Sequence, residues 1–226
     1  IGATGIFLDA FGYDYRVSRN RQNQLITACR GYGVPVIVNS WRPDYVFSNK
    51  NFAMSDGFQS NPDEVPCIVG ENDYYIFENH TYRCSPSTDG LQEVNGSERV
   101  YQAIHYRYAP QDEFNGQSYY DVYKTKTLSL NGLEEPNERF FNEAYLVALA
   151  CGCHGFGMSA SSWSDPNYSH FIPPQVIGSD KEVRLQSYTY DEANEQLSIK
   201  THVNKHEINV QWDQSGNIKS AYDFPN

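Results

Sequence analysis

Short apolar runs that end in polar residues recur along the first 160 residues of the chain. The runs Gly-Ile-Phe-Leu-Asp at 5–9 and Val-Pro-Val-Ile-Val-Asn at 34–39 are the clearest examples. Such short apolar runs are typical of buried parallel strands. Between them, Ser18 predicts the start of a helix that runs to about Arg30, where glycines follow. The order strand, helix, strand therefore predicts a right-handed parallel crossover.

Strand-like and helical segments continue to alternate up to residue 159. We expect further strands at 74–78, 119–130 and 154–159, and helices that begin at Ser97 and Pro136. After Pro136, apolar residues recur at helical spacing, as Phe141, Ala144 and Ala148 illustrate. The chain is therefore predicted to hold five parallel strands with three or more helices between them.

A different pattern begins after about residue 171. Apolar and polar residues alternate at 197–203, 208–212 and 218–222, and short polar turns separate these runs. Such alternation predicts antiparallel strands that bury one face. We therefore divide the chain into a β/α portion, residues 1–170, and a small antiparallel β meander, residues 171–226.

The composition of the chain argues against some classes of binding partner. The chain has 17 Lys and Arg against 28 Asp and Glu, a net charge of −11, and such an acidic surface repels phosphate backbones. No stretch approaches the roughly 20 apolar residues that span a membrane. Aromatic residues make up 15% of the chain, and 18 of them are tyrosines, which suit both sheets and sugar-binding surfaces. We therefore expect no nucleic acid and no membrane span.

The five cysteines do not form a metal-binding pattern. Cys151 and Cys153 are too close together for an ordinary zinc-site pair, and no clustered histidines and carboxylates accompany them. Cys67 and Cys84 flank one predicted strand and can pair if the protein is exported, whereas buried thiols are the alternative. Phosphate-binding loops and nucleophile elbows are also absent from the sequence. We expect no metal and no cofactor.

Polar residues at the ends of the predicted strands form the candidate site. In parallel α/β folds the functional groups gather where the strands end. Asp9 follows the first strand, Asn39 and Trp41 follow the second, and Glu78 and His80 end the third. Further candidates for substrate contact are Tyr13, Asp14 and Trp163. Paired carboxylates suit glycoside cleavage, and flat aromatic side chains suit sugar rings, so a carbohydrate is the expected partner.

Asp9 and Glu78 are the catalytic candidates. Asp9 stands directly after Ile-Phe-Leu, where neighbouring residues offer the carboxylate little structural role. The alternative is that Asp9 organises the loop 10–17 as a cap or through a salt bridge. Glu78 is equally open to a structural role. A carboxyl separation of about 5–5.5 Å would predict retention of anomeric configuration, and roughly 6.5–9.5 Å would predict inversion.

Three segments carry a resemblance to a known family. They are Gly-Ile-Phe-Leu-Asp-Ala-Phe-Gly-Tyr-Asp-Tyr at 5–15, Arg-x-Arg-Gln-Asn at 19–23 and Val-Ile-Val-Asn-Ser-Trp-x-Pro-Asp-x-Val-Phe at 36–47. Together they resemble glycosidase-like barrels of the endo-α-1,4-galactosaminidase and spherulin-4 type, and residues 73–82 and 134–163 fit more loosely. The resemblance implies a (β/α)8 TIM-barrel-like fold of which this chain holds about strands 4 to 8. It also implies that Asp9 is a catalytic-type carboxylate with Glu78 as its partner.

The first hypothesis is a glycoside hydrolase that acts on a polysaccharide, with amino-sugar polymers among the options. Asp9 would act as nucleophile or base and Glu78 as general acid, while Asn39, Trp41 and Trp163 position the sugar. The alternatives are a catalytically silent barrel in an extracellular assembly, such as a surface layer, fibre or phage tail, and a carbohydrate-binding module without hydrolysis. We expect an extracellular or cell-surface protein whose barrel is completed by an N-terminal segment or a second chain.

Overall fold

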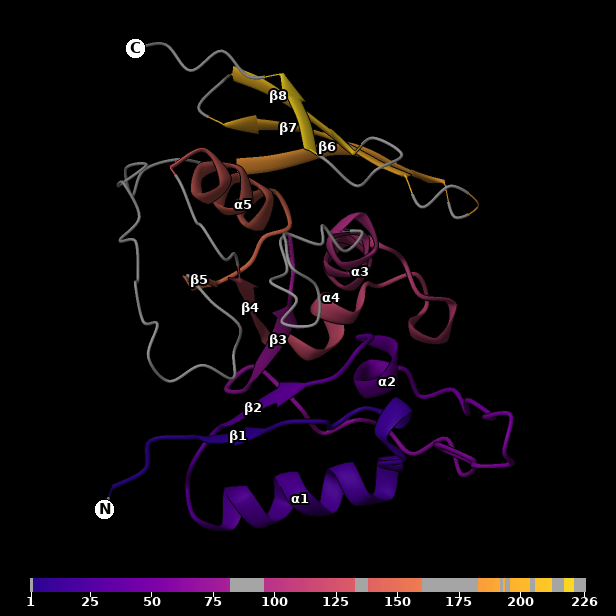
Figure 1. Cartoon of the computed structure of the whole chain (residues 1–226). Coiled ribbons are helices and arrows are strands. Elements are labelled where there is room, and N and C mark those ends of the chain that lie inside the picture. Colours follow the sequence, from indigo (N-terminus) through magenta and orange to yellow (C-terminus); the bar gives the residue numbers. More distant parts are fainter. Residues whose placement is uncertain are drawn as a thin grey trace. The chain divides into compact units, whose positions relative to one another are not determined.

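The fold was analysed in a computed structural model. It describes residues 2–81, 96–132, 138–159, 183–191, 193, 196–203, 206–212 and 218–221. The strands are β1 (Ile6–Leu8), β2 (Val36–Asn39), β3 (Tyr74–Glu78), β4 (Lys126–Gly132), β5 (Gly155–Ser159), β6 (Val183–Asp191), β7 (Gln196–Val203), β8 (His206–Trp212) and β9 (Ile218–Ala221). The α-helices are α1 (Arg19–Gly31), α2 (Asp44–Phe47), α3 (Gly96–Tyr108), α4 (Tyr119–Tyr123) and α5 (Glu138–Ala150), and two 3-10 turns are η1 (Tyr13–Tyr15) and η2 (Asp112–Phe114) (Figure 1).

Two sheets organise these strands. The first is a five-stranded parallel sheet with the order β1-β2-β3-β4-β5, in which Leu8 lies opposite Val38 and Asn39 lies opposite Ile76. The second is an antiparallel meander with the order β6-β7-β8-β9. The predicted α/β class, with a parallel sheet followed by antiparallel strands, is confirmed.

The chain divides into two compact units. The first comprises Ile1–Phe77 with Gln102–Leu128, and the second comprises Glu78–Tyr101 with Ser129–Asn226. Asp9, Asn39 and Trp41 belong to the first unit, whereas Glu78 and His80 belong to the second.

The start of α1 follows the sequence prediction. Ser18 is the N-cap residue, and its side chain accepts a hydrogen bond from the backbone N–H of Arg21. This bond satisfies one of the N–H groups that a helix leaves unpaired at its start. In Figure 1, α1 lies alongside β1 and β2. The predicted crossover of strand, helix and parallel strand is therefore present.

The predicted strand at 119–130 is wrong in its first half. Residues Tyr119–Tyr123 form the short helix α4, and the strand begins only at Lys126. Ser118 and Asp121 form a capping box, in which each side chain bonds the other residue's backbone N–H. Lys124 then ends the helix in a left-handed conformation with φ 55°. The local capping chemistry outweighs the strand propensity of the tyrosines.

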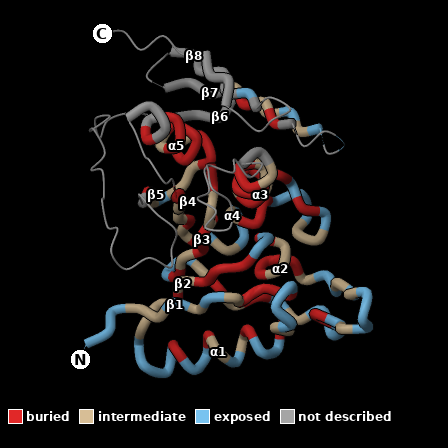
Figure 2. The backbone as a smooth tube through the Cα atoms, in the orientation of Figure 1, coloured by how far each residue is buried: buried red, intermediate tan, exposed pale blue. Residues whose placement is uncertain are grey.

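Aromatic side chains fill the core of the first unit. Phe47 lies 5.4 Å from Tyr75 and 4.8 Å from Tyr106 between ring centroids, and both tyrosines are fully buried. On the same side of the sheet, Val36 and Val38 are also completely buried. By contrast Phe7, which points to the other side, is 51% exposed. Figure 2 shows the buried residues of β2 and β3 in red. The sheet in this unit is therefore packed mainly on one face.

The buried Arg19 side chain binds the C-terminal end of α2. Arg19 donates from its guanidinium group to the carbonyls of Val46 and Ser48, the latter at 2.7 Å, and to the Gln22 side chain at 2.8 Å. Its guanidinium also lies 5.5 Å from the centre of the Tyr13 ring. No carboxylate pairs with Arg19 among the described residues, so its charge is held by backbone and amide oxygens.

Three of the cysteines are buried without a disulfide. Cys29, Cys67 and Cys151 are buried free thiols, and Cys153 is partly buried. Cys67 therefore agrees with the alternative of a buried thiol and not with a disulfide to Cys84, which itself lies outside the described residues. Within the part of the chain that the structure describes, no helix has the length and apolar character needed to cross a membrane.

Candidate functional site

Asp9 is an exposed carboxylate held at the end of β1. Its Oδ1 accepts a hydrogen bond of 2.9 Å from the Asn39 side chain and another of 2.9 Å from the backbone N–H of Ala10. Asn39 is 8% exposed and ends β2, one residue beyond the Leu8–Val38 pair. The parallel register thus places the two side chains next to each other. The bond from Ala10 connects the Asp9 carboxylate to the first residue of the loop 10–17.

The loops after β1 and β2 pack closely together. A Cβ atom added to Gly12 would lie 2.7 Å from Cβ of Ser40 and would also overlap the carboxylate of Asp14. The backbone N–H of Phe11 donates to the carbonyl of Asn39 at 2.8 Å. Only glycine allows this approach without a shift of the loops. The segment 10–17 is therefore fixed against the end of β2.

Trp41 and Asp14 are accessible, but Tyr13 is not. Trp41 is 39% exposed and follows Asn39 by two residues, and Asp14 is exposed within η1. Tyr13 is completely buried, with its ring 5.9 Å from those of Tyr45 and Phe52, and burial raises its pKa to about 12. Tyr13 therefore occupies an interior position rather than a surface where a sugar could bind.

Glu78 and His80 follow each other in the second unit. Glu78 is the last residue of β3 and is half-buried. His80 is completely buried, with Nδ1 2.7 Å from the hydroxyl of Ser129. Burial, aided by the charge of Arg99, lowers the pKa of His80 to about 3. His80 is thus a neutral interior residue at physiological pH. Trp163 lies outside the described residues.

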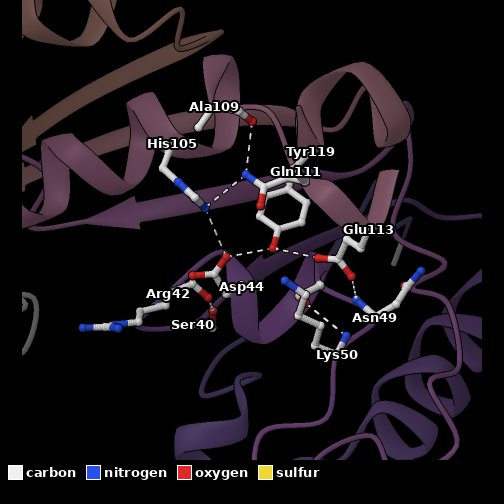
Figure 3. A network of polar contacts seen from close by, with 11 residues as sticks. Ser40, Arg42, Asp44, Asn49, Lys50, His105, Ala109, Gln111, Glu113 and Tyr119 are labelled. Atoms are coloured by element: carbon white, nitrogen blue, oxygen red, sulfur yellow. Dashed lines mark hydrogen bonds and ion pairs between the residues drawn. The ribbon is translucent and has the colours of Figure 1, made fainter. Parts of the chain in front are cut away.

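A second polar cluster in the first unit was not expected from the sequence (Figure 3). Asp44 begins α2, His105 lies near the end of α3, and Tyr119 begins α4. Oδ1 of Asp44 accepts a hydrogen bond of 2.8 Å from the Tyr119 hydroxyl and lies 3.4 Å from Nε2 of His105. The side chains of His105 and Asp44 are 25% and 30% exposed, so both remain open to solvent.

The loop 109–118 completes this cluster. Glu113 lies with Oε1 3.2 Å from the Tyr119 hydroxyl, and its Oε2 accepts a hydrogen bond of 2.8 Å from the backbone N–H of Asn49. Nε2 of Gln111 lies 3.2 Å from Nε2 of His105 and donates to the carbonyl of Ala109 at 3.1 Å. Figure 3 shows these side chains converging on Asp44 and the Tyr119 hydroxyl.

The electrostatics of the cluster favour a charged Asp44. Partial burial would raise the pKa of its carboxyl group, but the hydrogen bond and charge of His105, the Tyr119 hydroxyl and the charge of Arg42 outweigh this effect and lower it. The pKa of Tyr119 is raised by burial and by the neighbouring Asp44 and Glu113 carboxyl groups. The Tyr119 hydroxyl therefore keeps its hydrogen and acts as a donor to a carboxylate.

This second cluster could hardly be predicted from the sequence. Only Asp44 stands close to a predicted strand end, five residues after Asn39. His105 lies inside a helix and Tyr119 lies 75 residues from Asp44, so no local spacing connects them. Among the described residues, no group of three or more His, Cys, Asp and Glu could hold a metal ion. The contacts of the cluster are hydrogen bonds and one His–Asp contact.

Comparison with known proteins identified no relative. No protein-family model, no curated protein and no solved structure matched the chain. Functional arguments therefore rest on the residues of this chain.

Proposed function

We propose that this protein is a glycoside hydrolase that acts on a polysaccharide, with Asp9 as the carboxylate at the scissile bond. The observation that carries the proposal is the Asp9–Asn39 pair. An exposed carboxylate stands at the C-terminal end of a parallel strand, and a buried amide holds it at 2.9 Å. Such a position is where functional groups gather in parallel α/β folds.

Trp41 supplies a second element of the proposed site. Trp41 is 39% exposed and lies on the β2–α2 connection, two residues after Asn39 at the end of β2. An aromatic face of this kind packs against the apolar face of a sugar ring. Asn39 would keep the Asp9 carboxylate oriented, because its Nδ2 donates to one oxygen and leaves the other for a ligand. An amino-sugar polymer fits this arrangement, since a protonated amine would be attracted to an exposed carboxylate.

The finer fold proposal is that the five parallel strands are the later strands of a (β/α)8 barrel of the endo-α-1,4-galactosaminidase and spherulin-4 type. Two observations support it. Phe7 lies on the edge strand β1 and is 51% exposed, whereas the opposite face of the sheet in the same unit is buried. An apolar strand edge of this kind favours pairing with further strands, supplied by an N-terminal segment or a second chain.

Glu78 is the proposed general acid. It is the last residue of β3, and its side chain is half-buried. The role is tested with Glu78→Gln, which removes the proton donor but keeps the shape of the side chain. A catalytically silent carbohydrate-binding protein, at the cell surface or in an extracellular assembly, is the alternative to the enzyme.

The test compares Asp9→Asn with Asp63→Asn on a panel of neutral and amino-sugar polysaccharides. Asn at position 9 can still accept the bonds from Asn39 and Ala10 but cannot act as a base or nucleophile. Asp63 is an exposed carboxylate in the 48–72 loop and serves as the matched control. We expect Asp9→Asn to lower kcat by at least about 100-fold with binding retained, while the control keeps the original rate.

Other outcomes would overturn the hydrolase proposal. If Asp9→Asn hydrolyses the polymer as fast as the original protein, Asp9 is not the reacting carboxylate. If the original protein binds a polysaccharide of the panel but cleaves none, the silent carbohydrate-binding alternative replaces the enzyme.

A further inference from the structure

One ring nitrogen in the second cluster lies between a donor and an acceptor. Nε2 of His105 is 3.2 Å from Nε2 of Gln111 and 3.4 Å from Oδ1 of Asp44 (Figure 3). A carboxylate oxygen only accepts hydrogen bonds, and an amide nitrogen only donates them. Nε2 of His105 must therefore carry a hydrogen to bond Asp44, and must lack one to bond Gln111.

The orientation of the Gln111 amide is fixed independently. Its nitrogen donates to the carbonyl of Ala109 at 3.1 Å, and a flipped amide would set two oxygens against each other there. Gln111 therefore presents its NH2 group to His105. The two bonds of Nε2 are mutually exclusive, and the protonation of the ring decides between them.

The charges around the imidazole come from several elements. The Asp44 carboxylate faces it from α2, and Arg42 lies just before that helix. The Tyr119 ring lies 5.8 Å from the imidazole at the start of α4, and its hydroxyl connects to Glu113 on η2. On α3 itself, Arg107 is directed at the Tyr120 ring, 3.4 Å away, so Arg107 is engaged elsewhere.

We propose that His105 is a proton-dependent latch for the loop 109–118. The neutral ring accepts the hydrogen bond from Gln111 and fastens the loop to α3. A protonated ring donates from Nε2 to Asp44, and Gln111 then faces a donor, so its NH2 group loses the bond to His105 and keeps only the bond to the Ala109 carbonyl. Protonation of the ring therefore exchanges a loop–helix contact for a helix–helix contact between α2 and α3.

The backbone of Gln111 would pass this change on to its loop. Its N–H donates to the carbonyl of Gln117 at 3.0 Å, and its carbonyl accepts from the N–H of Gly116 at 3.0 Å. Glu113 stays bonded to Asn49 at the same time. The release therefore affects the Gln111 side of the loop, while its other side stays attached.

Nitrogen-15 NMR of the imidazole and side-chain amide groups tests the latch. At pH 8 we expect His105 as the Nδ1–H tautomer, with Nε2 unprotonated. On acidification the Gln111 side-chain amide should shift with the same midpoint as His105. In Gln111→Met the donor is absent, so we expect the pH 8 tautomer to change to Nε2–H, directed at Asp44. Gln117→Met is the control, because that exposed side chain lies in the same loop and should leave the tautomer unchanged.

Two results would overturn the latch. One is an Nε2–H tautomer in the original protein at pH 8, which needs no variant to observe. The other is a Gln111 amide resonance that stays constant while His105 titrates. Both measurements use the ligand-free protein, so they succeed or fail independently of the proposed glycoside hydrolysis.

Discussion

The buried imidazole of His80 should make the second unit sensitive to weak acid. The ring is completely buried beside Ser129, and its pKa is lowered from 6.5 to about 3. Because the unfolded chain binds a proton at this site below about pH 6.5 and the folded chain does not, acidification favours unfolding. The contribution of the neutral His80 ring to the free energy of unfolding is fully present at pH 8 and is lost progressively between about pH 6.5 and 3.

The size of the effect follows from these two pKa values. At pH 5 the unfolded site is about 97% protonated and the folded site is about 1% protonated, which gives a loss of about 2 kcal/mol relative to pH 8. The assay is urea unfolding at pH 8 and pH 5, followed by circular dichroism, in the original protein and in His80→Gln. Glutamine is neutral at both pH values and still offers a polar group to the Ser129 hydroxyl.

Comparing the original protein with His80→Gln removes the contribution of the other titrating groups to the pH dependence of stability. His80→Gln should be less stable than the original protein at pH 8, because an interior ring is lost. However, its stability should fall by about 2 kcal/mol less between pH 8 and pH 5. If both proteins lose the same free energy of unfolding over that range, the folded site takes up the proton, and the burial argument for His80 is refuted.

Three further substitutions test other parts of the fold. Gly12→Ala should destabilise by about 1–3 kcal/mol, because a Cβ would meet Cβ of Ser40 at 2.7 Å, whereas Gly31→Ala, with no atom within 4 Å, should be neutral or slightly stabilising in thermal melts. Arg19→Met should cost about 2–4 kcal/mol in urea unfolding, since the buried carbonyls of Val46 in α2 and of Ser48 just after it lose their donor; an unchanged midpoint would contradict this role. Ser118→Ala should cost about 1 kcal/mol through loss of the α4 capping box, and a cost near zero would show that α4 does not depend on its cap.

Regular elements with a strong local signal were predictable from the sequence. Ser18 and the apolar run at 34–39 correctly located the start of α1 and strand β2, because a cap and a buried strand each leave a local pattern. The tyrosine-rich segment at 119–123 was misassigned, since strand propensity there competes with the Ser118 cap. The sequence pattern did not predict strand β6 (Val183–Asp191) as a separate strand, although this segment lies within the predicted meander.

The candidate site was also predictable only in part. The pairing of Asp9 with Asn39 was predictable, because adjacent parallel strands bring their C-terminal ends together. The interior positions of Tyr13 and His80 were not, since burial depends on packing between distant segments. The bond between Tyr119 and Asp44 joins residues 75 positions apart, and only the folded chain brings them together.

Binding of an oligosaccharide to the end of β1 and β2 is the most direct test of the account. The measurement is an NMR titration of nitrogen-15-labelled Asp9→Asn protein with oligosaccharides from the polymer that the original protein cleaves or binds. We expect the Trp41 indole and the Asn39 side-chain amide to shift with one saturating curve, while the exposed Gln24 amide on α1 stays constant. Saturable binding that leaves Trp41 and Asn39 unchanged would contradict the proposed site.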